Sequence, residues 1–184
     1  MQDVIAILDD RLANAGDTLP VAGHMEQEGY QLGEHDFTLP DGLDYDLMLT
    51  NAGEGILATG IVRGHVVGTC DRCLERAEFD LAAEVDEYYL FHAPSQTDSL
   101  GEDEDDVDFS LVGDDHTIDL TEALVSAVLM DTPFVVLCRE DCKGLCPVCG
   151  ENLNERDCGH AAQIEEERLS SSPFAALRNL KLDD

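Results

Sequence analysis

The chain has 184 residues with 41 acidic and 10 basic side chains, a formal net charge of −31, and a hydrophobic content of 43%. This hydrophobic content excludes a wholly disordered chain, and the lack of an apolar run of about 18 residues predicts no transmembrane helix. The charge disfavours general binding to nucleic-acid phosphates, which depends on Lys and Arg, and favours a basic protein partner. The alternative is an acid-rich proteome, in which the charge serves only solubility.

The first 34 residues are predicted to form a short amphipathic helix followed by a loop. Val4, Ile5, Leu8 and Leu12 recur at helical spacing, with acidic residues between them. Residues 14–34 contain four residues that favour a loop: Gly16, Pro20, Gly23 and Gly29. The N-terminal residues lack the basic and then apolar pattern of an export signal, so we expect a cytoplasmic protein.

Residues 35–93 are predicted to form an antiparallel β region. Apolar and polar residues alternate from Phe37 to Leu49 and again from Ala77 to Val85, which indicates half-buried strands. Residues 51–55 supply one turn, and Cys70-Asp-Arg-Cys73 occupies the next. A metal ion bound at this second hairpin would fix the register of its strands.

Residues 94–112 differ in composition and are predicted to form an acidic linker. Their run of carboxylates contains almost nothing apolar: Asp98, Glu102, Asp103, Glu104, Asp105, Asp106 and Asp108. Such a block is typical of a solvated tether, with partner binding as the alternative. It lacks the order of oxygen ligands that a calcium loop requires.

Residues 113–163 are predicted to contain a helix and then a metal-binding segment. The helix should run from Asp119 to Met130, with Asp119 and Glu122 forming a capping box. Pro133 should end it and lead into a strand at residues 135–138. The tail, residues 164–184, combines a charged helical piece with an apolar strip at Phe174, Leu177 and Leu180 that we expect to dock on the rest of the fold.

Together these patterns predict an α+β fold, with an antiparallel β-rich centre, a few helices and a zinc-knuckle C-terminal segment. The seven cysteines and one histidine supply enough ligands for two tetrahedral ions: Cys70, Cys73, Cys138, Cys142, Cys146, Cys149, Cys158 and His160. Two residues between thiolates allow both sulfurs to reach one ion, and a glycine such as Gly150 lets the following chain turn.

We expect two zinc ions with a split set of ligands, because the short loop at residues 143–145 makes it hard for one ion to take four ligands from Cys138 to Cys149 and still leave Cys158 a partner. Cys70 and Cys73 should join Cys138 and Cys142, which would tie the sheet to the strand after the helix. The second site should be local, and its four ligands are Cys146, Cys149, Cys158 and His160.

The cysteines have three alternative interpretations. A disulfide framework requires an oxidising compartment, and seven cysteines would leave one unpaired. A redox Cys-x-x-Cys pair usually opens a helix after a strand, a context that neither pair here shares. Buried reduced thiols are the remaining alternative.

The sequence predicts no enzyme and no catalytic residue. It lacks a phosphate-binding loop, a nucleophile elbow and a zinc-protease helix motif, and two closed four-ligand sites would leave no position for a reacting water. The five other histidines are scattered, without a partner cysteine or a repeated carboxylate spacing: His24, His35, His65, His92 and His116.

Several segments resemble the bacterial large ribosomal RNA subunit accumulation family (YceD-type). Cys70-Asp71-Arg72-Cys73 is similar to that family's central Cys-x-Arg-Cys motif, and residues 118–122 look like its helix opening. Residues 137–154 are similar to its cysteine-rich segment nearly throughout, and residues 173–177 to its C-terminal end. Many relatives have Cys-x-Cys where this chain has Cys158-Gly-His160, but histidine is also a competent zinc ligand.

This resemblance implies a ribosome-assembly factor that supports accumulation of large-subunit ribosomal RNA. The acidic charge favours binding of a basic ribosomal protein or assembly partner. Direct binding of ribosomal RNA through Arg139, Lys143 and Arg156 is the alternative, and a thiol-based redox or zinc switch is a third.

Overall fold

A computed structural model describes residues 3–93 and 110–171 of the chain. The chain forms two compact units. The first comprises Met1–Gly68 and Glu78–Phe134, and the second comprises Thr69–Ala77 and Val135–Asp184. The second unit is therefore assembled from the β6–β7 turn and the C-terminal part of the chain.

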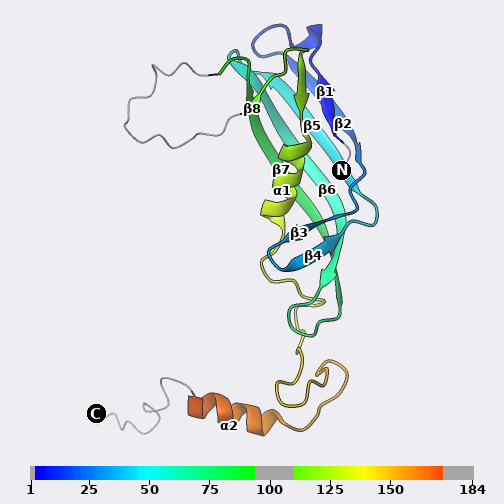
Figure 1. The fold of residues 1–184 in the computed structure, drawn as a ribbon, viewed down its shortest axis with the longest axis vertical. Coiled ribbons are helices and arrows are strands. Elements are labelled where there is room, and N and C mark those ends of the chain that lie inside the picture. Colours follow the sequence, from blue (N-terminus) through cyan, green and yellow to red (C-terminus); the bar gives the residue numbers. More distant parts are fainter. Residues whose placement is uncertain (1–2, 94–109, 172–184) are drawn as a thin grey trace, which may run out of the picture. The chain divides into compact units, whose positions relative to one another are not determined.

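The first unit is built on a sheet of seven strands that run in the order β2-β5-β6-β4-β3, with β7 on β6 and β8 on β7 (Figure 1). The strand bounds are β2 (Thr18–Met25), β3 (Gly29–Leu32), β4 (His35–Thr38), β5 (Leu43–Asn51), β6 (Gly55–Thr69), β7 (Arg76–Leu90) and β8 (Ser110–Leu111). The pairs β2–β5, β3–β4, β4–β6 and β5–β6 are antiparallel, and β7–β8 is parallel. A separate antiparallel pair joins β1 (Ile5–Ile7) and β9 (Thr117–Asp119).

Helix α1 (Thr121–Asp131) packs on the sheet and is anchored at both ends. The hydroxyl of Tyr89 in β7 donates to the carbonyl of Asp119 at 2.9 Å, and Tyr30 in β3 bonds Thr132 at 2.8 Å. The inward-facing apolar side chains of the strands and the apolar face of α1 form one core. Its largest fully buried side chains include Leu43, Leu47, Leu49, Ile56, Leu120 and Leu124. The α+β class with an antiparallel β-rich centre is confirmed.

The predicted N-terminal helix is wrong. Ile5 and Ile7 are exposed while Ala6 is buried, which is the alternation of strand β1, and only the 3-10 helix η1 (Asp10–Leu12) follows. The cause is tertiary: Ala6 pairs with Ile118, and the Val4 amide donates to the Thr121 hydroxyl at 2.8 Å. A short segment with helical periodicity does not form a helix when a strand partner and a buried hydrogen-bond acceptor are available to it.

The predicted loop at residues 14–34 is also wrong, since it contains β2 and β3. Pro20 is compatible with β2, because this strand pairs with β5 and lies at the edge of the sheet, where a missing amide donor is tolerated. Gly23 is compatible with it for a different reason. A Cβ there would lie 2.5 Å from the Tyr45 hydroxyl oxygen, so this glycine makes room for the ring directly across the strand pair.

Three expectations farther along the chain need correction. Leu120 rather than Asp119 occupies the N-cap of α1, and the Asp119 carboxylate accepts instead from the Thr121 amide at 2.9 Å. Residues 135–138 form no strand, because their backbone joins no ladder. The expected acidic linker overlaps β8 at Ser110 and Leu111, which pair with β7. Residues 94–109 of that run and the apolar strip at Phe174 lie outside the described residues.

The second unit has little regular structure. It holds the turn between β6 and β7, an isolated bridge between Leu145 and Asn152, and helix α2 (Ala161–Ser171). α2 carries the charged piece predicted for the tail, and its Arg168 lies 4.0 Å from Glu165. Among its described residues, only Ala77, Val136 and four cysteines are buried apolar side chains, so this unit depends on something other than a large core for its stability.

Candidate metal centres

Each Cys-x-x-Cys pair in the second unit forms a turn of the same kind. In the first turn, residues 70–74, the Leu74 amide donates to the Cys70 carbonyl at 2.9 Å, and Leu74 has φ +61°. In the second, residues 146–150, the Gly150 amide donates to the Cys146 carbonyl at 2.8 Å, and Gly150 has φ +73°. We call these the first and second knuckle. In both, the left-handed fifth residue closes the chain around the two sulfurs.

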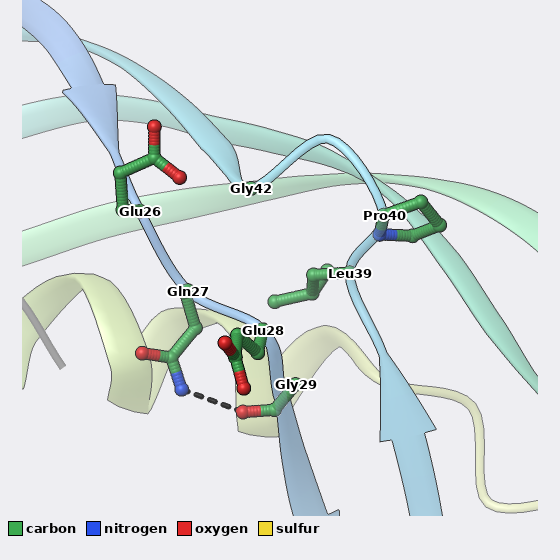
Figure 2. A pocket seen from close by; sticks show the side chains of 7 residues that line it. All are labelled: Glu26, Gln27, Glu28, Gly29, Leu39, Pro40 and Gly42. Atoms are coloured by element: carbon green, nitrogen blue, oxygen red, sulfur yellow. Dashed lines mark hydrogen bonds between the residues drawn. The ribbon is translucent and has the colours of Figure 1, made fainter.

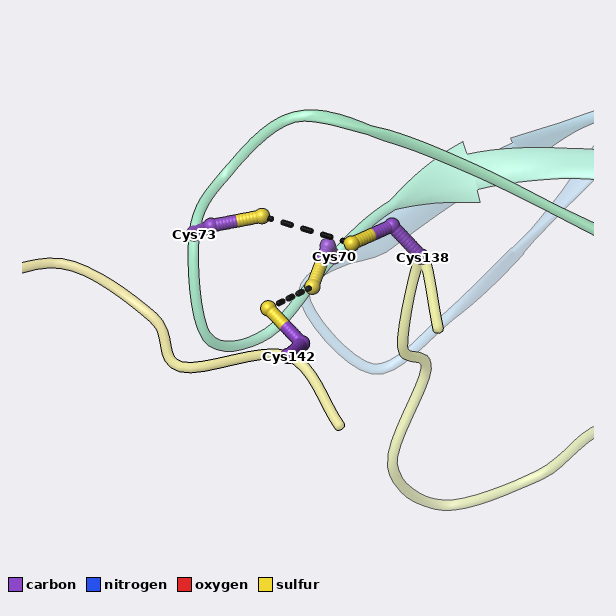
Figure 3. A group of neighbouring side chains, drawn as sticks. All are labelled: Cys70, Cys73, Cys138 and Cys142. Carbon is purple, nitrogen blue, oxygen red and sulfur yellow. Dashed lines mark hydrogen bonds between the residues drawn. The ribbon is translucent and has the colours of Figure 1, made fainter. Parts of the chain in front are cut away.

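The first cluster consists of Cys70, Cys73, Cys138 and Cys142, whose side chains converge in Figure 3. The Sγ atoms of Cys70 and Cys142 are 3.8 Å apart, and those of Cys73 and Cys138 are 3.6 Å apart. A tetrahedral zinc ion with bonds of about 2.3 Å separates its sulfurs by roughly 3.8 Å. Disulfide sulfurs would be about 2.05 Å apart, so the geometry fits a metal site and not a disulfide.

The second cluster consists of Cys146, Cys149, Cys158 and His160. The histidine faces the sulfurs through Nδ1, which is 3.8 Å from Cys146 Sγ and 3.3 Å from Cys158 Sγ. In both clusters every ligand atom lies within 4.8 Å of the others. The first cluster is largely buried, whereas Cys149 of the second is exposed.

Backbone amides prepare one sulfur in each cluster for ionisation. Burial of Cys70 opposes its thiolate, but the amides that face the sulfur, led by that of Cys138, outweigh burial and lower its pKa to about 6. Burial likewise opposes ionisation of Cys146, and the amides of Cys149 and Val148 contribute to lowering its pKa to about 6. The thiolate is the form that binds metal, so these two residues are suited to bind first.

The neighbouring thiols behave differently. Burial, followed by the adjacent thiol of Cys73, raises the pKa of Cys138 to about 12. The pKa of Cys142 is lowered, chiefly by the hydrogen bond from Asn154. A cation at the centre of the cluster would favour the thiolate of every one of these residues, and metal binding would therefore release protons.

Three polar residues brace the first cluster, and sequence reasoning gave none of them this role. Asn154 donates from Nδ2 to Cys142 Sγ at 3.3 Å, while its Oδ1 accepts from the Lys143 amide at 2.8 Å. Arg72 donates to the Cys142 carbonyl at 2.8 Å, and Asp71 accepts from the Val136 amide at 2.7 Å. The only sequence signal was their place inside the motifs, since the contacts arise from the tertiary fold.

The structure thus brings the eight expected ligands into the two expected groups. Within residues 3–93 and 110–171, no other set of three or more His, Cys, Asp or Glu side chains meets the same distance criterion. Two other histidines form surface pairs, His24 with Asp44 at 2.8 Å and His65 with Asp80 at 2.9 Å. His35, His92 and His116 join neither cluster.

The first unit also has an open depression of about 700 Å³, shown in Figure 2. Glu26, Gln27, Glu28, Gly29, Leu39, Pro40 and Gly42 line it. The side-chain amide of Gln27 donates a hydrogen bond from Nε2 to the Gly29 carbonyl at 2.6 Å. Two glutamates and an already bonded amide provide no nucleophile with a base beside it, so the depression supports no catalytic assignment.

A mainly antiparallel β unit and a small unit with two cysteine-rich clusters that could hold metal ions define the class of this protein. Residues 58–181 match the family model described as large ribosomal RNA subunit accumulation protein YceD. The chain belongs to this family, as its cysteine-rich segments suggested. All eight expected ligands fall within the matched range.

Similar proteins come from mycobacteria and are named only as uncharacterized. Those of Mycobacterium tuberculosis and Mycobacterium bovis are 40% identical over 111 residues, which is 60% of this chain and 51% of theirs. A Mycobacterium leprae protein is 32% identical over 111 residues, 60% of this chain and 49% of its own. The chain spans about half the length of the curated relatives it matches. No solved structure matches it. Neither helix of the described residues has the length and apolar character needed to cross a membrane.

Proposed function

We propose that the protein is a non-enzymatic, cytoplasmic ribosome-assembly factor that supports accumulation of large-subunit ribosomal RNA. The observation that carries this proposal is the family match over residues 58–181, which includes both cysteine-rich clusters. The role in RNA accumulation comes from the family description.

We further propose that each cluster holds one Zn²⁺ ion in a structural role. Cys₄ and Cys₃His sets are typical structural zinc sites, and the interatomic distances in both clusters suit a tetrahedral ion. Four protein ligands leave no position open for a reacting water. Zinc contributes on the order of 10 kcal/mol to the folding of small modules, which would compensate for the small core of the second unit.

The favoured partner is a basic ribosomal protein or assembly factor. The first unit carries 29 acidic and 2 basic residues, Arg11 and Arg63, and so has a net charge of −27. The second carries 12 acidic and 8 basic residues, a net charge of −4. Because the first unit is so acidic, it would steer a cationic protein toward the molecule and repel phosphate.

Direct RNA binding remains the alternative, because eight of the ten basic residues belong to the second unit. Two candidate cations already have acidic neighbours: Arg156 lies 2.7 Å from Glu151, and Arg139 lies 3.5 Å from Asp141. The unit also contains no Phe, Tyr or Trp before Phe174, and the one histidine of its described part, His160, belongs to the second cluster. Both facts favour the protein partner. A redox or zinc switch would use the same thiols but has no further support.

A pull-down with nuclease treatment tests this choice. We expect purified tagged protein to retain a basic large-subunit protein after the RNA has been digested. Loss of every partner on digestion, together with tight binding of purified large-subunit RNA at physiological salt, would support the RNA-binding alternative.

A further inference from the structure

Leu74 occupies a backbone conformation that its residue type disfavours. Its φ of +61° is in the left-handed region, where a Cβ is crowded and where Gly or Asn is usual. The hydrogen bond from its amide to the Cys70 carbonyl at 2.9 Å belongs to the knuckle turn. The conformation is therefore imposed by the metal-site turn and does not arise from freedom of the chain.

The second knuckle shows that this turn does not require a side chain at the fifth position. Gly150 makes the same hydrogen bond there, and a Cβ on it would meet nothing within 4 Å. Glycine at position 74 would form the turn without strain. The leucine is thus unfavourable for the local backbone.

The Leu74 side chain also gains little from packing, since the residue is 67% exposed. An apolar side chain that is both strained and exposed stabilises neither the turn nor the core. Strained residues persist where the surrounding structure holds them in place, and they cluster at functional sites.

We propose that Leu74 is an anchor through which the first knuckle binds a basic protein partner, by inserting into an apolar pocket on that partner. This inference rests on the proposed function, whose partner-binding surface it locates. The knuckle turn fixes the backbone on which the leucine stands, so the side chain is presented with little entropy left to lose on binding. Central apolar anchors of this kind carry much of the energy of protein interfaces.

The chemistry of the position favours protein over RNA. An aliphatic side chain cannot stack on a base as an aromatic ring does. The neighbouring Arg72 donates to the Cys142 carbonyl, so its guanidinium already has a partner within the cluster. An acidic chain with an exposed leucine at a rigid turn fits a cationic protein surface with an apolar pocket.

The test compares the wild type with Leu74→Asn, because Asn tolerates the left-handed region and is polar. The matched control is Val135→Asn, which removes an exposed apolar residue from the same unit outside both knuckles (Val135 is 59% exposed). The probe is the protein fraction of large ribosomal subunits, extracted free of RNA. Any protein that the wild type retains is then purified and titrated against each variant. Zinc content and the urea midpoint are measured in parallel.

We expect L74N to keep the wild-type zinc content and an equal or higher urea midpoint, and to bind the retained protein at least tenfold more weakly, while V135N binds as the wild type does. Equal binding by L74N would overturn the anchor and leave the proposed function intact. Loss of zinc or a lower midpoint in L74N would show a structural role and also overturn it. If the wild type retained no protein from the fraction, the anchor and the protein-partner form of the proposed function would both fail.

Discussion

The sulfur atoms of Cys73 and Cys138 lie 3.6 Å apart although 65 positions separate them in the chain. Cys73 belongs to the turn between β6 and β7, whereas Cys138 follows α1, so the first cluster closes a long loop. The ligands of the second cluster lie within residues 146–160 and close a short one. Closing a long loop without a metal has the larger entropic cost, so the two clusters should respond differently to the loss of a ligand.

The first prediction concerns the number of metal ions. Protein purified without added zinc should contain close to two equivalents, and Cys73→Ser and Cys146→Ser should each contain close to one, because the two clusters share no ligand. Elemental analysis measures both values. A single equivalent in the wild type, or a joint loss of both ions in either variant, would contradict two independent sites.

Hydrogen exchange on the same two variants should separate the clusters. C146S should lose protection at residues 144–160, where the Cys146 amide bonds the Glu151 carbonyl at 2.8 Å. C73S should lose protection at the β6–β7 turn and at residues 135–142. The amides of β5 should stay protected in both. Identical exchange patterns would refute this division.

A second prediction uses two glycines with nearly equal backbone angles. Gly144 and Gly159 have φ values of +75° and +76°, but a Cβ on Gly144 would lie 2.9 Å from the Arg72 carbonyl oxygen, whereas one on Gly159 would meet nothing within 4 Å. Gly144→Ala should therefore destabilise the second unit by about 1–3 kcal/mol more than Gly159→Ala. Thermal unfolding with zinc present measures this difference, and equal losses would show that the close approach of Gly144 does not matter.

A third prediction concerns Asn154, which holds the Cys142 thiolate through its side-chain amide at 3.3 Å. Asn154→Leu should raise the Cys142 pKa and weaken metal binding by about 10–100-fold, as is usual for loss of a group that supports a metal ligand. Competition with a chromogenic chelator measures the affinity. Glu155→Gln, a change at the next and exposed position, is the control and should retain wild-type affinity.

The sequence allowed the candidate ligands and their grouping to be proposed because Cys-x-x-Cys spacing is a local signal. Helix α1 and the β6–β7 turn could be predicted for a similar reason, since apolar periodicity and Pro133 are readable without a partner. The contact between Asn154 and Cys142 could not be predicted in this way. It depends on how the chain between these two residues folds, and no local pattern indicates that.

The errors in the first 34 residues have one physical origin. Pro20 and Gly23 disfavour a strand when considered alone, but β2 lies at a sheet edge and Gly23 faces the Tyr45 ring across the pair. Likewise, the strand at Ile5 exists only because β9 pairs with it. Strand propensity depends on neighbours that single-sequence patterns do not contain.

A fourth prediction concerns His65, whose pKa is raised above 6.5, chiefly by its hydrogen bond to Asp80. Because the folded-state pKa is the higher one, the pair stabilises the fold fully below pH 6.5, and this contribution is lost as the pH rises through the folded-state pKa. Asp80→Asn should lower the His65 pKa toward 6.5. Asp86→Asn removes an equal charge from the same strand and should change it much less. NMR titration of the ring measures both, and equal shifts would exclude the hydrogen bond as the main cause.

The last prediction addresses RNA. If Arg139, Lys143 and Arg156 are the cations available to phosphate, about three contacts give a salt slope near −2, and raising the salt from about 50 to about 200 mM should weaken binding to purified large-subunit RNA roughly 20-fold. Replacing all three by Gln should remove this weak binding and leave capture of a basic protein partner unchanged, because that contact depends on the acidic surface and on Leu74. Filter binding across salt concentrations measures the slope. RNA binding that stays tight at about 150 mM salt and survives the triple substitution would contradict the prediction, because so few cations can neutralise only a few phosphates.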